Sequence, residues 1–127
     1  MIQVTKQAIL PQKVVDSLKT DVSGSVVMHL AILRPSLEGQ KLVSIEYDMD
    51  KATAEKELSQ IEGAIRVKWE VQDISLCRRA GKLILGEIIL VAAVSAPHRK
   101  EAFEACQYAV EQLRGMTSVK KREIYEQ

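Results

Sequence analysis

Hydrophobic and polar residues follow two different periods along this chain, and each change of period marks a new element. Alternation with a period of two, or a short run of β-branched and apolar residues, indicates a strand. Such segments predict strands at 2–6, 25–33, 41–49, 70–78, 87–94 and 118–125. The segment at 87–94 is apolar from Ile88 onward, which is typical of a central strand.

Three other segments have the spacing of helices. Pro11 suits the first turn of a helix that runs to about residue 19, and Asp50 is a natural N-cap for a second helix. A third helix is expected to start near Ser95 and Pro97 and to end at Gly115. The expected buried positions of the second helix are Ala54, Leu58, Ile61 and Ile65. Those of the third helix are Ala102, Cys106, Ala109, Val110 and Leu113.

The resulting order is β-α-β-β-α-β-β-α-β, with turns at 34–39 and 80–82. Hairpins without regular βαβ alternation favour an α+β fold, with mostly antiparallel strands and two or three helices, over a doubly wound one. The 127 residues contain no low-complexity stretch, repeat or linker. Residues 1–127 are therefore expected to form a single domain around one core.

Charge narrows the classes of function. With 18 Lys/Arg against 17 Asp/Glu, the net charge is +1, and three Tyr, one Phe and one Trp offer few stacking platforms, so a nucleic-acid partner is not expected. The charge is nevertheless uneven, since residues 76–122 hold nine basic and four acidic residues, a net of +5. This excess predicts a local site for a small anion.

Several common functional signals are absent from the sequence. No signal peptide follows Met1, and no apolar run approaches the roughly 20 residues that span a bilayer, so a cytoplasmic protein without membrane contact is expected. Cys77 and Cys106 form no CxxC motif and are expected to be inert. His29 and His98 are too few for most metal sites, and no GxGxxG, GxxxxGK[ST], HExxH or GxSxG motif occurs. We expect no metal and no permanently bound cofactor.

The remaining candidates are basic. His98 and Arg99 fall in the first turn of the third helix, where free backbone N–H groups favour an anion, and Arg114 lies at its far end. Neighbouring residues of a strand point to opposite faces, so Lys121 is separated from the basic residues on either side of it. A solvated basic face is the alternative for each of them. The residues alone thus predict an anion site, for phosphate or carboxylate.

Three motifs at this spacing resemble the large, catalytic subunit of molybdopterin synthase. They are Gly81-x-Leu83-x-x-Gly86-Glu87, His98-Arg99-x-x-Ala102-Phe103-x-Ala105 and Lys121-Arg122-Glu123. The resemblance runs from about residue 22 to residue 123. It implies an α/β-hammerhead fold, a homodimer, and a small ubiquitin-like sulfur-carrier partner that ends in Gly-Gly, together a heterotetramer.

The resemblance also implies a reaction. The partner's C-terminal thiocarboxylate enters a pocket of the large subunit, and two sulfur atoms are delivered to cyclic pyranopterin monophosphate. The product is the dithiolene of molybdopterin, a step in molybdenum cofactor biosynthesis. A phosphate and an anionic tail in one pocket would explain why several cations converge.

Site residues follow from the same resemblance. Lys121 matches the lysine of the family's Trp-Lys-Arg-Glu motif and is the expected chief catalytic residue, with Arg114 where the family has its other catalytic lysine. Arg34 matches the arginine that closes the family's first conserved strand. His98 and Arg99 match a His-Arg pair that helps bind anionic substrate groups near the dimer interface. We therefore expect Lys121 and Arg114 to be catalytic and Arg34, His98 and Arg99 to bind substrate.

The chain also departs from the family pattern. Arg114 keeps the charge of the lysine but is not a neutral amine near neutral pH, so it is expected to hold an anion. Lys120 replaces the family's Trp, Arg78-Arg79 replaces its His-Arg before the glycine turn, and many members continue past the position of Gln127. These departures leave an alternative open: a non-catalytic dimeric relative that binds the small partner or an anionic pterin without turnover.

Overall fold

The computed structural model describes residues 1–35 and 39–126. In chain order their elements are β1 (Ile2–Thr5), α1 (Pro11–Ser17), β2 (Ser25–Ile32), β3 (Leu42–Asp48), α2 (Lys51–Lys68), β4 (Asp73–Arg79), β5 (Gly81–Ile84), β6 (Ile88–Ala96), α3 (Arg99–Arg114) and β7 (Lys120–Tyr125).

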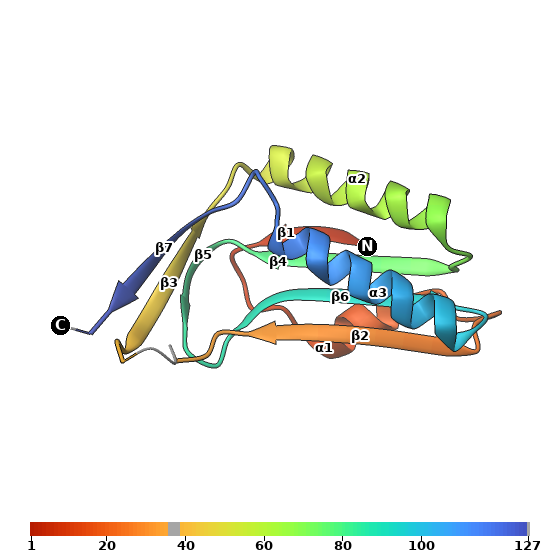
Figure 1. Ribbon diagram of the computed structural model, residues 1–127, viewed down its shortest axis with the longest axis horizontal. Helices are drawn as coiled ribbons and strands as arrows, with labels where there is room; N and C mark the ends of the chain where they lie inside the picture. Colours follow the sequence, from red (N-terminus) through yellow and green to blue (C-terminus); the bar gives the residue numbers. More distant parts are fainter. Residues whose placement is uncertain (36–38, 127) are drawn as a thin grey trace.

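The strands form two sheets. Four of them lie in the order β1-β4-β6-β2, in which β1 and β4 are parallel and the other neighbours are antiparallel. The second sheet, β5-β3-β7, is antiparallel throughout and stands at one end of the first (Figure 1). The expected α+β class, with mostly antiparallel strands, is confirmed, and β6 is central as predicted.

Helices cover both faces of the four-stranded sheet. α2 and α3 pack on one face through the largest apolar cluster, and α1 packs on the other through a smaller cluster that includes Val14, Cys77 and Val91 (Figure 1). All four predicted positions of α2 are buried, as are those of α3 except Val110, which is only partly buried. A third cluster lies beside the second sheet, around Ile45, Tyr47 and Leu83. No helix within 1–35 and 39–126 is both long and apolar enough to cross a membrane.

Three element predictions were wrong in detail. The segment expected to hold only a turn at 80–82 continues as β5, because the chain passes at Gly81, with a φ of 86°, from β4 into the second sheet, where Gly81–Ile84 pair with β3. Ser95 belongs to β6, where it pairs with β4 and β2, so α3 starts only at Arg99. The strand expected at 70–78 starts at Asp73 and is buried on both faces. Of the turn expected at 34–39, residues 36–38 lie outside the described residues.

Candidate active site

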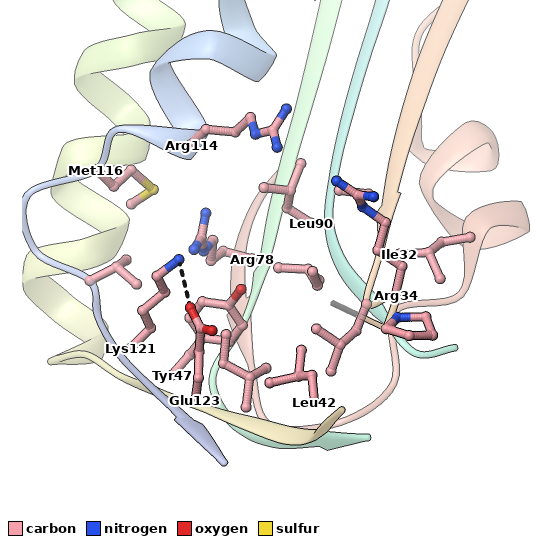
Figure 2. Close-up of a pocket in the computed structure, with 16 residues that line it drawn as sticks. Ile32, Arg34, Leu42, Tyr47, Arg78, Leu90, Arg114, Met116, Lys121 and Glu123 are labelled. Atoms are coloured by element: carbon pink, nitrogen blue, oxygen red, sulfur yellow. Dashed lines mark ion pairs between the residues drawn. The ribbon is translucent and has the colours of Figure 1, made fainter. Parts of the chain in front are cut away.

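A pocket of about 600 Å³ lies where the two sheets meet (Figure 2). One side is formed by the four-stranded sheet, at the end of β2, the first half of β6 and the C-terminal end of β4. The other side comes from β3 and β7 of the second sheet, and the C-terminus of α3 closes the end. Residues distant in sequence thus reach one cavity because the second sheet stands against the end of the first.

Four cationic side chains line this pocket: Arg34, Arg78, Arg114 and Lys121. Their charged ends lie around the same space in Figure 2, and Glu123 is the one carboxylate among the described lining residues. Within the described part of the chain, the three arginines have no carboxylate at ion-pair distance. Uncompensated positive charge in a partly enclosed cavity attracts and holds an anion.

Lys121 lies on the pocket face of β7, as strand alternation predicted. In the pairing of β3 with β7 it stands opposite Tyr47, another lining residue, whereas Arg122 points to the other face and pairs with Glu46. The Lys121 Nζ is 3.3 Å from Glu123 Oε1, and its side chain is 61% exposed. The ammonium is therefore held by one carboxylate and is still open to a ligand.

Glu123 itself stays ionised beside Lys121. Hydrogen bonds from the Tyr125 hydroxyl and the Lys121 ammonium lower the pKa of this carboxyl below its ordinary value. The lysine and its carboxylate therefore form a charged pair at neutral pH.

Arg78 is the lining residue that sequence reasoning missed. In the sequence it stands out only as part of Arg78-Arg79, a departure from the family pattern. The sequence feature that could have identified it is strand alternation. On β4, Arg78 shares a face with Ile74 and Leu76 and therefore points beneath α3. An arginine is seldom buried, so its residue type gives no reason to expect Arg78 inside the fold.

The guanidinium of Arg78 is fixed from two sides. Its Nη1 donates a hydrogen bond of 2.7 Å to the carbonyl of Leu113, in the last turn of α3, and it lies 5.0 Å from the centre of the Tyr47 ring. Burial lowers the pKa of Arg78, and the nearby Tyr47 and Glu57 oppose that shift. The ordinary pKa of an arginine side chain is so high that Arg78 keeps its charge at neutral pH despite this shift.

His98 and Arg99 do not reach the pocket. His98 is the N-cap of α3 and makes no side-chain capping bond, Arg99 is the first residue of the helix, and both are exposed. Arg114 lies at the other end of the same 16-residue helix, a length of about 24 Å. Of the predicted site residues, the structure brings together Arg34, Arg114 and Lys121 and leaves the His-Arg pair at the far end of α3.

The two thiols lie away from the pocket. Cys77 packs beneath α1, and the Cys106 Sγ donates a hydrogen bond of 3.5 Å to the carbonyl of Ala92. Burial raises the pKa of both thiols to about 11, so neither is a thiolate at neutral pH. This agrees with the expectation that both cysteines are inert.

The fold and the pocket define the class of protein: an α+β domain with a cationic pocket at the junction of its two sheets. The chain belongs to the MoaE protein family, whose model matches residues 4–116. This confirms the resemblance to the molybdopterin synthase catalytic subunit, a family of molybdenum cofactor biosynthesis.

Individual relatives agree. The molybdopterin synthase catalytic subunit of Bacillus subtilis (strain 168) is 32% identical over 124 residues, which cover 98% of this chain and 79% of the relative. That of Rattus norvegicus is 33% identical over 127 residues, which cover 100% of this chain and 64% of the relative.

Solved structures share the fold. The crystal structure of molybdopterin synthase from Staphylococcus aureus superposes with a TM-score of 0.93 at 31% identity, covering 98% of this chain and 91% of that one. A complex of subunits 1 and 2 of molybdopterin-converting factor from Helicobacter pylori has a TM-score of 0.73 at 13% identity, covering 100% of this chain and 91% of that one.

Proposed function

We propose that this chain is an active catalytic subunit that transfers sulfur from a thiocarboxylated small partner to cyclic pyranopterin monophosphate, forming the molybdopterin dithiolene. The observation that carries the proposal is the convergence of Arg34, Arg114 and Lys121 on one pocket in a chain of this family. The substrate's phosphate and the partner's tail are both anions, and such a pocket suits them.

Each cation has a role that its chemistry allows. Lys121, with its accessible ammonium, binds the reacting anion and donates a proton as the cyclic phosphate opens. Arg114 and Arg34 hold oxyanions without exchanging protons. For each sulfur transferred, the partner's thiocarboxylate becomes a carboxylate, with water supplying the oxygen.

The sulfur must come from outside this chain. Both cysteines are buried and protonated and lie away from the pocket, so they offer no sulfur nucleophile. A solved chain with this fold belongs to a complex of subunits 1 and 2 of molybdopterin-converting factor, and we propose a second, small subunit as the donor for this chain as well. The C-terminal tail of this proposed partner, ending in Gly-Gly, would enter the pocket between the sheets.

His98 and Arg99 take part only if a second copy supplies them. They sit about one helix length from Arg114, so a homodimer that places the start of one α3 near the pocket of the other copy would complete the site. We therefore propose a homodimer of large subunits, each with one small partner.

The arginine at position 114 separates this proposal from the non-catalytic alternative. The test is to purify the chain together with its small Gly-Gly partner, load the partner as thiocarboxylate, and measure the dithiolene product for the wild type and for Arg114→Lys. We expect the wild type to turn over and Arg114→Lys to change the rate by less than about tenfold, since the charge is kept. An inactive wild type that gains activity only as Arg114→Lys would establish a lapsed enzyme.

A further inference from the structure

We propose that Arg78 is a buried anion anchor of the pocket, which binds an oxyanion of the ligand in addition to those held by Arg34, Arg114 and Lys121. The inference deepens the proposed function and rests on it, because it concerns the same pocket. The family resemblance assigns no such role, since it places a histidine at this position.

The first argument is that Arg78 is buried with no anion in direct contact, since Glu57 acts on it only as a nearby charge and forms no ion pair with it. Only 6% of the residue is exposed, and among the described residues its Nε has no hydrogen-bond partner and its guanidinium no carboxylate at ion-pair distance. A buried charge without a counterion is costly, and removing it from water is compensated only by a partner. The pocket that Arg78 lines supplies the place for that partner.

The second argument is that the guanidinium is held in position before any ligand arrives. The Leu113 carbonyl and the Tyr47 ring occupy part of its surroundings. Because Leu113 directly precedes Arg114, the same contact links Arg78 to the helix end that carries a second arginine. A fixed planar guanidinium loses little entropy when it binds a carboxylate or phosphate through two parallel hydrogen bonds.

Arg79 provides the contrast. It is equally buried and adjacent in sequence, but it points to the opposite face of β4, and its Nη1 lies 3.1 Å from Glu87 Oε2. One arginine of the pair thus has its counterion within the chain. Arg78 instead faces the pocket, where an oxyanion of the ligand supplies the counterion.

Two probes distinguish the sources of the oxyanion: inorganic phosphate, and a short peptide that ends in Gly-Gly with a free carboxylate. The same peptide with an amidated C-terminus is the negative control. The dissociation constant of each is measured at pH 7.5 for the wild type, Arg78→Met, Arg78→Lys and Arg79→Met, with the melting temperature of each variant. We expect Arg78→Met to weaken at least one probe by about tenfold or more and Arg78→Lys to weaken it less. Arg79→Met should bind both probes as the wild type does.

The probe that depends on Arg78 identifies the anion: phosphate points to the substrate, the peptide carboxylate to the partner's tail. The inference is overturned if folded Arg78→Met, or Arg78→Lys should the former not fold, binds both probes within twofold of the wild type. It is also overturned if the wild type binds neither. A purely structural role would lower the melting temperature without changing either dissociation constant. Anion binding that depends on Arg78 in a chain that forms no dithiolene would refute the proposed function and leave this inference intact.

Discussion

At the scale of single residues, the Glu57 carboxylate fixes one wall of the pocket. It lies on α2 and accepts hydrogen bonds from the backbone N–H and the hydroxyl groups of both Thr117 and Ser118, at 2.6 to 3.3 Å. Those residues join α3 to β7, next to the lining residues Met116 and Val119. Partial burial alone would raise the pKa of Glu57, but the hydrogen bonds together outweigh it and the pKa is lowered.

Glu57→Gln should therefore destabilise the fold in a pH-dependent way. A carboxyl whose pKa is lower in the folded state stabilises the protein above its unfolded pKa of 4.5, and this contribution is lost as the pH falls through the folded value. We expect the free energy of unfolding in urea to fall by about 1 kcal/mol at pH 7, a modest value for a group that is partly exposed. The difference should shrink below pH 4.5.

Glu55→Gln is the matched control, because Glu55 lies on the same helix and, among the residues that the structure describes, its side chain makes no hydrogen bond or ion pair. Equal stability of wild type and Glu57→Gln at pH 7, or a difference that persists unchanged in acid, would contradict this role of Glu57.

Single residues also show how well strand alternation predicts which side chains point into the fold. It placed Lys121 on the inner face of its strand, and the structure agrees. The same rule applied to β4 puts Arg78 beside Leu76, but a buried arginine contradicts the usual exposure of that residue type. Only the arrival of the C-terminus of α3, with the Leu113 carbonyl, shows why Arg78 is accommodated there.

At the scale of elements, local signals predicted the helices and most strands. Asp50 caps α2 as expected, accepting a hydrogen bond from the Thr53 N–H, and the apolar spacing of α2 and α3 identified their buried sides. β5 was missed because a four-residue strand that starts with glycine has little local signal of its own. It becomes a strand through its pairing with β3, from Tyr47 opposite Gly81 to Ser44 opposite Ile84.

At the scale of the whole molecule, the pocket of one chain does not bring together the complete set of expected site residues. Arg34, Arg114 and Lys121 are assembled by the junction of the two sheets, which no local sequence pattern encodes. His98 and Arg99 lie at the far end of α3. If the pair acts on the substrate, it does so from a second copy.

Mixed dimers test this arrangement. We expect Lys121→Ala and Arg99→Ala each to have low activity as homodimers. A dimer of one copy of each retains one intact composite site, so co-expression of the two variants should restore activity well above either alone. The yield of dithiolene, measured on heterodimers isolated with two affinity tags, gives the answer. Heterodimers no more active than the homodimers would place Arg99 outside the site or in the same chain's site.

The most direct test of the central claim compares two neighbouring lysines of β7. Both lysines are exposed, but Lys121 lines the pocket and Lys120 is not among its lining residues. Lys121→Ala and Lys120→Ala are each mixed with thiocarboxylated partner and cyclic pyranopterin monophosphate, and dithiolene formation is followed. The account predicts that Lys121→Ala stays folded and loses activity by about 100-fold or more, while Lys120→Ala keeps nearly all of it. Near-normal turnover by a folded Lys121→Ala would contradict it.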